Sequence, residues 1–419
     1  MIKRSIASVI DQALLSGLNF SVGLYLISTV PKGAYGLYVQ LFAVGVLFCG
    51  VVDALVANAL ANLSSRHPPA VMAPKVALAQ VIARLLGMLL ALLGGGLAYG
   101  LQWDVSLGND RGWVALAFVV YVGSLAFRDF KRVLLYLDQR ALDVLKLDGL
   151  FVGLALLGGG GLHLMNQVSL VSIFGVLALA NTVALLLTPV ATRLGGFRWS
   201  AVVEAWRECW GITRWALPGL AMGWMGNSLY LYVAGFQLGL EATAELNASR
   251  LLLMPVTLLT VAWQQMARSD VAQLIMRGQR DAFLPFLLKS AAVILVPMAL
   301  YLGVLYVVYG PVAGLISADK YVYFSELLAI WIIYLLIYAV KFVGTVLMVG
   351  FGDFLVLLKM NVASLALQCI LLVTLPPIWG IQSVVVCLMA SELLEAIVIW
   401  GRLLPERLRS MPTLNGVGA

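Results

Sequence analysis

The chain has 419 residues, of which 62% are hydrophobic and only 11% are charged, with a formal net charge of +7 at pH 7. Soluble domains are usually about 45–50% apolar and about 25% charged, so this composition excludes an ordinary soluble protein and predicts a polytopic membrane protein. The four cysteines and two histidines lack metal-ligand spacing, and no GxxxxGKS or GxxxxGKT phosphate loop occurs. We therefore expect no metal site, no cofactor, no disulfide framework and no ATPase.

Twelve segments are long and apolar enough to cross a bilayer, for which a helix needs about 20 largely apolar residues. In chain order they are residues 6–30, 36–62, 76–101, 113–137, 143–162, 167–190, 214–238, 243–267, 283–309, 323–348, 353–376 and 380–401. The fold class that they predict is an all-α polytopic membrane protein with about 12 transmembrane helices.

A polar segment with several tryptophans separates the first six of these helices from the last six, and we expect it to lie on the cytoplasmic surface as an amphipathic linker. Shifting the chain by 208 positions places Asn19 on Asn227 and Gly36 on Ala244. Such a pattern fits a transporter built from two six-helix repeats. The expected organisation is therefore an N-terminal lobe (1–190), a linker (191–213), a C-terminal lobe (214–401) and a cytoplasmic tail (402–419).

The basic residues are distributed asymmetrically about these helices. With the N-terminus in the cytoplasm, only Lys32, Arg111 and Lys320 fall outside, and most of the 27 lysines and arginines fall at or near the cytoplasmic face. The positive-inside rule then places both termini in the cytoplasm. Orientation and lipid contact explain most of these charges, so the net charge does not call for a nucleic-acid partner.

After the basic residues at or near the two faces are set aside, four remain deeper in the predicted spans, namely Arg84, Arg250, Lys341 and Lys359. Each costs about 2.5–3.5 kcal/mol at the bilayer centre on insertion scales. Lys359 lies close to the inner face and can extend its ammonium to the headgroups. The other three need a partner, a cavity or a ligand.

These three cations belong to helical faces that also carry polar or aromatic groups. The stripes are Gln12 and Asn19 in the first span, Gln80 and Arg84 in the third, Asn227, Tyr230 and Gln237 in the seventh, Asn247, Arg250, Thr257 and Gln264 in the eighth, and Trp331, Tyr334, Tyr338, Lys341 and Thr345 in the tenth. Hydrogen bonding between packed helices explains any single amide. Taken together, the cationic stripes favour a hydrated central cavity, because polar stripes facing lipid are costly.

A cavity with guanidinium and ammonium groups suits an anion, phosphate in particular. The neighbouring tyrosine and tryptophan rings suit sugar faces or an amphipathic ligand. Acidic residues also lie at membrane depth, namely Asp11, Asp53, Glu392 and Glu395. They can pair with the basic residues or carry a coupling cation, and Asp53 is the candidate for ion coupling.

Three segments resemble one known family. They are "DQALLSGLNFSVGLYLISTVPKGAYGLYVQ", "FRDFKRVLLYLDQRALDVLKLDGL" and "GLEATAELNASRLLLMPVTLLTVAWQQMA". They are similar to segments of the polysaccharide flippases, the O-antigen and exopolysaccharide transporters of the multidrug/oligosaccharidyl-lipid/polysaccharide (MOP) exporter superfamily. The third motif often ends in a proline in that family, and Gln264, Gln265 and Met266 occupy that region here.

The resemblance implies a V-shaped transporter whose two six-helix lobes rock about a central cavity. It implies a substrate, a polyprenyl-pyrophosphate oligosaccharide, that moves by alternating access from the cytoplasmic to the outer leaflet of the bacterial inner membrane. Polysaccharide polymerases and glycosyltransferases would then be protein partners. In this hypothesis Arg84 and Lys341 bind the pyrophosphate, Arg250 holds it in the outward state, and four rings contact the sugars: Tyr230, Trp331, Tyr334 and Tyr338.

Two alternatives stay open. A drug or cation antiporter of the same superfamily predicts cationic substrates and an essential acidic residue such as Asp53. A membrane polysaccharide polymerase or ligase is disfavoured because the predicted outer loops are short, so no catalytic residues are proposed and we do not expect an enzyme.

Overall fold

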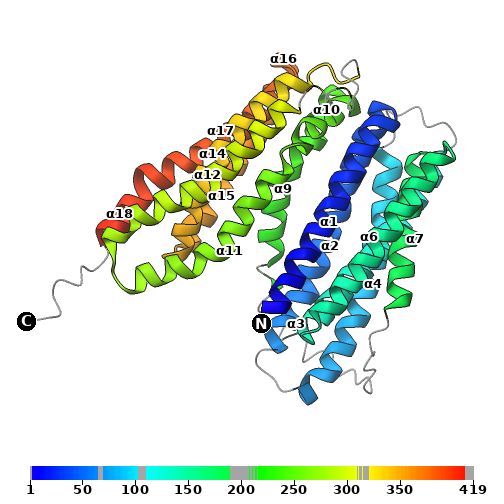
Figure 1. The fold of residues 1–419 in the computed structure, drawn as a ribbon, viewed down its shortest axis with the longest axis horizontal. Helices are drawn as coiled ribbons and strands as arrows, with labels where there is room; N and C mark the ends of the chain where they lie inside the picture. The colour runs from blue at the N-terminus through cyan, green and yellow to red at the C-terminus, as the bar shows by residue number, and fades with distance from the viewer. Residues whose placement is uncertain are drawn as a thin grey trace, which may run out of the picture. The chain divides into compact units, whose positions relative to one another are not determined.

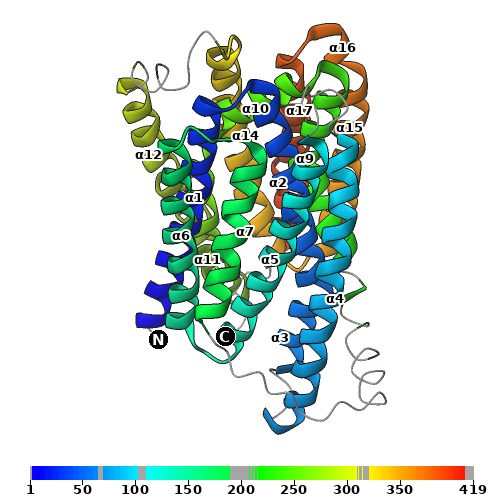
Figure 2. The same cartoon turned by 90° about the vertical axis from the view of Figure 1, so that its right-hand side faces the viewer.

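A computed structural model describes residues 2–64, 69–101, 110–188, 213–214, 216–308 and 320–410, together with residues 207, 210, 310 and 314. All regular secondary structure within these residues is helical (Figures 1 and 2). In the first half the elements are α1 (Ile2–Thr29), α2 (Lys32–Val52), η1 (Asp53–Ala57), α3 (Asn58–Ser64), α4 (Pro69–Leu101), α5 (Arg111–Leu137), α6 (Ala141–Leu164) and α7 (Leu170–Leu187).

The second half is also helical. Its elements are α9 (Ala216–Leu238), α10 (Leu240–Leu251), α11 (Met254–Met276), η4 (Arg280–Ala282), α12 (Phe283–Val307), α14 (Phe324–Gly350), α15 (Phe354–Thr374), α16 (Pro376–Trp379), α17 (Gln382–Val398), η5 (Ile399–Leu403) and α18 (Leu404–Ser410). Each of the twelve predicted spans has a helical counterpart, and nine helical segments of the described residues are long and apolar enough to cross a membrane. The predicted all-α, multi-pass fold class is confirmed.

The predicted continuous helix over 243–267 is wrong, because the chain breaks between α10 and α11 at Leu252 and Leu253. Pro255 occupies the first turn of α11. In an unbroken helix its ring would clash with the carbonyl of Leu251, and proline also disfavours helical geometry in the residue before it. The break makes Arg250 part of the last turn of α10.

The last membrane helix is longer than expected. The helix that begins at Gln382 continues through the π-helical η5 and α18 to Ser410, although we expected a tail from residue 402. A second π-helical segment, η1, joins α2 to α3 in one long span from Lys32 to Ser64. Most of the expected linker (191–213) and residues 411–419 of the tail lie outside the described residues.

Two compact units divide the chain: the N-terminal unit, Met1–Ser228, and the C-terminal unit, Leu229–Ala419. The division falls inside α9, so the first half of this helix belongs to the N-terminal unit. In the N-terminal unit α4 packs on α5, α5 on α7, and α6 on both α1 and α7. Gly94 permits the close approach of α4, because a β-carbon there would lie 3.0 Å from a ring atom of Phe48 and 3.1 Å from one of Phe118.

In the C-terminal unit α14 is the central helix and contacts α10, α11 and α17. The indole Nε1 of Trp400, in η5, donates to the carbonyl of Val340 at 3.0 Å. Gly344 lets the two helices meet, because a β-carbon at this position would lie 2.6 Å from Ile399 Cγ2. Many outward side chains of both units are apolar, such as Leu85 at 65% exposed and Leu300 at 67%, as expected of surfaces that face lipid.

Candidate functional site

The best-defined polar cluster of the C-terminal unit surrounds Arg250. The guanidinium donates a hydrogen bond from Nη1 to the hydroxyl of Tyr230, on α9, at 2.8 Å. Its central carbon lies 5.3 Å from the ring centroid of Trp331, on α14, which is within cation–π range. Trp331 packs edge-on against Tyr230 at 5.8 Å and against Tyr334 at 5.1 Å. Three helices thus hold one guanidinium among aromatic rings.

This cluster, which we call the Arg250 cluster (Tyr230, Arg250, Trp331 and Tyr334), is mostly buried. Trp331 is 1% exposed and Tyr334 is 6% exposed, whereas Arg250 is partly exposed. The indole Nε1 of Trp331 is buried and has no hydrogen-bond partner among the described residues. A buried donor that stays unpaired costs roughly 1–3 kcal/mol. The cluster therefore holds a partly exposed guanidinium beside a buried indole N–H that has no partner among the described residues.

Lys341, in the same α14 helix, has a different environment. Its ammonium lies 2.8 Å from Glu392 Oε2 and 3.4 Å from Glu395 Oε2, both on α17. It also lies 5.3 Å from the ring centroid of Tyr338. One ammonium and two ionised carboxylates carry a net charge of −1. The sequence left two roles open for Glu392 and Glu395, pairing with a basic residue or carrying a coupling cation. The structure shows the pairing.

An aromatic ladder on α14 joins the two cations. The ring centroids are 5.1 Å apart between Trp331 and Tyr334, and 6.1 Å apart between Tyr334 and Tyr338. Ten residues separate Trp331 from Lys341, or about 15 Å along a helix. The predicted stripe of the tenth span is therefore real as a helical face, with Arg250 of α10 near one end and Lys341 with its two carboxylates at the other.

The structure places the other predicted site residues less closely together. Asn247 and Gln237 are partly exposed in the C-terminal unit, and Gln237 donates to the carbonyl of Val373 at 3.2 Å, which is a helix-to-helix contact. Asn227, in the N-terminal unit, is exposed and donates to the Gly223 carbonyl of its own helix. Three further residues of that unit are exposed on two different helices, Gln12 and Asn19 on α1 and Arg84 on α4.

Sequence reasoning missed a buried ion-pair network in the N-terminal unit. Arg132 Nη2 lies 2.8 Å from Asp11 Oδ2, and Arg132 Nε lies 2.6 Å from Asp148 Oδ2. Arg128 Nε lies 3.6 Å from Asp148 Oδ1, and both arginines are also within 4 Å of Asp129. We call Asp11, Arg128, Asp129, Arg132 and Asp148 the Arg132 network. It ties α1, α5 and α6 together.

Arg128 and Arg132 belong to the basic residues expected at or near the cytoplasmic face, and the structure adds that their side chains pair with carboxylates. Arg128 is 4% exposed and Asp148 is fully buried. The signal was present in the sequence, because residues 128 and 132 share one face of a helix and two apolar spans carry aspartates at membrane depth. Asp53, the predicted coupling residue, begins η1 and lies within electrostatic range of Asp129 and Arg132, so it borders this network.

Neither a known protein-family description nor a curated protein matches the sequence. Solved structures do match. A multidrug resistance MATE family transporter of the MOP superfamily, in an inward-facing conformation, matches with a TM-score of 0.72 and 14% identity over 94% of this chain and 96% of that one. The lipid II flippase MurJ matches with a TM-score of 0.74 and 10% identity over 96% and 87%.

A MOP superfamily transporter from Pyrococcus furiosus, described as having a binding pocket of reversed polarity, matches with a TM-score of 0.61 and 16% identity over 97% of this chain and 96% of that one. At such identities the likeness establishes the fold. This chain has the fold of MOP superfamily transporters, which include drug exporters and a lipid flippase.

Proposed function

We propose that the protein is an alternating-access transporter that moves a polyprenyl-pyrophosphate oligosaccharide from the cytoplasmic to the outer leaflet of the bacterial inner membrane. The observation that carries this proposal is the Arg250 cluster, in which a partly exposed guanidinium is held by a tyrosine hydroxyl and aromatic rings. A guanidinium offers two parallel N–H donors that match phosphate geometry. The adjacent rings offer flat apolar faces with polar edges for sugars.

The assignment of roles follows from these contacts. Arg250 binds the pyrophosphate, and the N–H of Trp331 donates to a further oxygen when the site is occupied. Tyr230 orients the guanidinium through its hydroxyl, and the partly exposed Tyr338 offers its ring to a sugar. Arg84, an exposed cation on α4, stays a predicted pyrophosphate contact of the N-terminal unit. The fold supports the proposal, because one protein that shares it is by name a lipid II flippase.

The cellular setting belongs to the same proposal. The positive-inside distribution supports cytoplasmic N- and C-termini, and the substrate class implies that glycosyltransferases and a polysaccharide polymerase act before and after this step. An inside-negative potential favours outward movement of an anionic headgroup by about 2.3 kcal/mol per charge per 100 mV.

A second candidate, a cation-coupled antiporter of the same superfamily, is favoured by a different observation. The group formed by Lys341, Glu392 and Glu395 carries a net charge of −1 when both carboxylates are ionised, so it attracts a cation. The shared fold includes multidrug transporters. In that case Glu392 would be the critical residue of the C-terminal unit and Arg250 would hold helices together.

One experiment separates the two. Arg250→Gln is compared with Lys359→Gln in a strain that lacks the chromosomal copy, with surface polysaccharide and membrane-bound lipid-linked oligosaccharide as readouts. Lys359 is the matched control, because it is another intramembrane cation of the same unit and its side chain is exposed. Arg250→Gln should lower surface polysaccharide at least about tenfold, the effect of losing a contact worth about 1.4 kcal/mol, and precursor should accumulate. Lys359→Gln should behave as wild type.

The contrary result is equally clear. If the deletion strain accumulates no precursor but becomes sensitive to cationic dyes, and Glu392→Gln reproduces that sensitivity, the antiporter reading replaces the flippase.

A further inference from the structure

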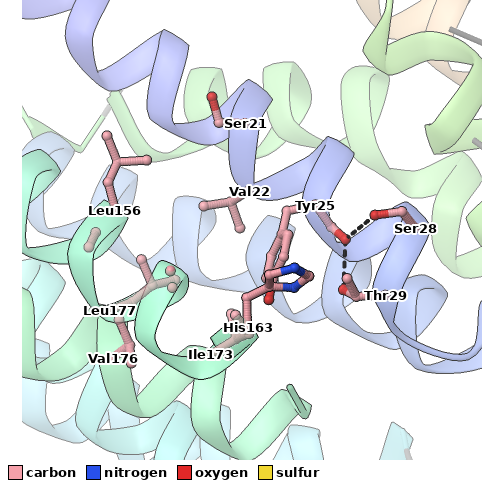
Figure 3. Close-up of a pocket in the computed structure, with 13 residues that line it drawn as sticks. Ser21, Val22, Tyr25, Ser28, Thr29, Leu156, His163, Ile173, Val176 and Leu177 are labelled. Atoms are coloured by element: carbon pink, nitrogen blue, oxygen red, sulfur yellow. Dashed lines mark hydrogen bonds between the residues drawn. The ribbon is translucent and has the colours of Figure 1, made fainter. Parts of the chain in front are cut away.

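A cavity of about 410 Å³ opens in the N-terminal unit, between the last turns of α1, the last turns of α6 and the first turns of α7 (Figure 3). We call it the α1/α6/α7 groove. Val22 and Tyr25 line it from α1, Leu156 and His163 from α6, and Leu177 from α7. No residue of the Arg250 cluster or of the Arg132 network lines it.

The apolar part of the groove has room for a hydrocarbon chain. The glycines of α6 differ in what surrounds them. A β-carbon on Gly158 would lie 2.6 Å from the side chain of Val176, so this glycine lets α7 approach. β-Carbons on Gly159 and Gly160 would meet nothing within 4 Å, so these two glycines leave open space. Leu156, on the groove wall, is 52% exposed. In a bilayer a groove with such apolar walls faces lipid tails.

The other part of the groove is polar. The hydroxyl oxygen of Tyr25 is buried and has no hydrogen-bond partner among the described residues. Its ring meets the imidazole of His163 edge-on, with centroids 5.8 Å apart. The hydroxyls of Ser28 and Thr29 donate to the backbone carbonyl of Tyr25, at 2.9 and 2.7 Å, as Figure 3 shows. A donor left unpaired in this way indicates an acceptor that the chain itself does not supply.

The acceptor must be weakly charged or neutral. The lining residues, all of which the structure describes, include no lysine, arginine, aspartate or glutamate. Phosphate and pyrophosphate groups are usually held by charge-assisted bonds to such cations. The ester carbonyl of a glycerophospholipid is a neutral acceptor attached directly to an acyl chain, so it matches both parts of the groove.

The depth of the groove agrees with this ligand. Tyr25 lies one turn, or about 6 Å, before the end of α1 at Thr29. Ester carbonyls lie just inside the headgroups, in the interfacial zone where tyrosine is enriched. We propose that the α1/α6/α7 groove is a phospholipid site, in which one acyl chain lies along Gly159 and Gly160 and its ester carbonyl accepts a hydrogen bond from the Tyr25 hydroxyl.

The N-terminal unit offers a matched control groove of about 360 Å³ between α5 and α7, lined by residues that include Trp113, Val120, Gly175 and Thr182. A β-carbon on Gly175 would also meet nothing within 4 Å. The polar group there is already satisfied, because the hydroxyl of Thr182 donates to the Ala178 carbonyl at 2.8 Å. The control groove thus has apolar walls, and none of its lining residues, all of which the structure describes, has a buried donor without a partner.

The test uses the purified full chain in vesicles of phosphatidylethanolamine that contain a phosphatidylethanolamine probe with a diazirine on one acyl chain. After photolysis, peptide mass spectrometry maps the labelled positions. Peptides that contain residues 153–163 of α6 should carry more label than peptides that contain residues 113–120 of α5, which line the control groove. Gly160→Leu should remove that excess, whereas Gly175→Leu should leave it unchanged.

Tyr25→Phe keeps the ring and the fold, and it should lower probe retention after washing about fivefold, the effect of one hydrogen bond of about 1 kcal/mol. Equal labelling of the two grooves, or labelling that Gly160→Leu leaves unchanged, would mean ordinary annular lipid and would overturn the proposal. So would displacement of the probe by a polyprenyl phosphate but not by unlabelled phosphatidylethanolamine, which would reassign the groove to an isoprenoid chain. None of these readouts requires transport, so the result is independent of the proposed function.

Discussion

Both units of this protein carry arginines at membrane depth, but their surroundings differ. In the Arg132 network two guanidiniums meet three carboxylates, and Arg128 and Asp148 are buried. In the Arg250 cluster one guanidinium meets a phenol and aromatic rings and stays partly exposed. Carboxylates that pair with a cation on a neighbouring helix hold helices together, whereas rings and a hydroxyl orient a guanidinium that stays partly exposed. The first arrangement is suited to structure and the second to ligand binding.

The largest effect is expected from Arg132→Ala. It leaves the carboxylates of Asp11 and Asp148 buried without their closest cation, and breaking a buried ion pair costs about 3–5 kcal/mol. Thermal unfolding in detergent, followed by size-exclusion chromatography, should show a large loss of folded protein. Arg140→Ala is the control, because the side chain of Arg140, which pairs with Asp143, is 41% exposed. An exposed ion pair of this kind is worth about 0–1 kcal/mol. Equal stability of the two variants would contradict a structural role for the network.

A smaller effect is expected at the second cation of α14. Lys341→Met leaves the adjacent carboxylates of Glu392 and Glu395 to repel each other, so the folded protein should lose stability. Adding Glu392→Gln should recover part of the loss, and a double-mutant cycle should give a coupling of about 0.5–3 kcal/mol. Additive effects within experimental error would show that the ion pair contributes nothing to the fold.

Tyr230→Phe tests whether the Arg250 cluster serves ligand binding and not stability. It removes the hydroxyl that accepts from Arg250 and leaves the ring that packs on Trp331. A hydrogen bond to a charged group is worth about 1.5–3 kcal/mol, so if Arg250 binds substrate, export should fall about tenfold or more. The melting temperature should fall less than in Arg132→Ala, which breaks a buried ion pair. An unfolded variant, or unchanged export, would remove Tyr230 from the site.

The smallest effect is expected from cysteine labelling of α14, which compares the exposure of position 338 with that of positions 331 and 334. A water-soluble thiol reagent should react at position 338, where the side chain is partly exposed, and should not react at 331 or 334, where the rings are buried. Position 336 is a useful control, because Leu336 is 43% exposed but lies away from the polar stripe. Rapid labelling at 336 with protection at 338 would place water on the opposite face of the helix.

Much of the fold was predictable because its signals are local. Apolar runs of sufficient length identified every helical span, and helix formation in a membrane follows from the need to pair all backbone groups within the segment. The break at Leu252 could also have been predicted from Pro255, although we expected an unbroken helix. The continuation of the last helix to Ser410 was missed because the residues after 402 are mostly polar.

The sequence by itself determined which segments form helical spans and which helical face of α14 carries the rings and Lys341. Only the tertiary structure decided what those groups meet. Lys341 and Glu392 are 51 positions apart, and Arg132 and Asp11 are 121 positions apart. Periodicity reports the face of one helix, while the partner of a charge depends on which helices pack together. For that reason the sequence could not distinguish the neutralised arginines of α5 from Arg250, which lies among aromatic rings.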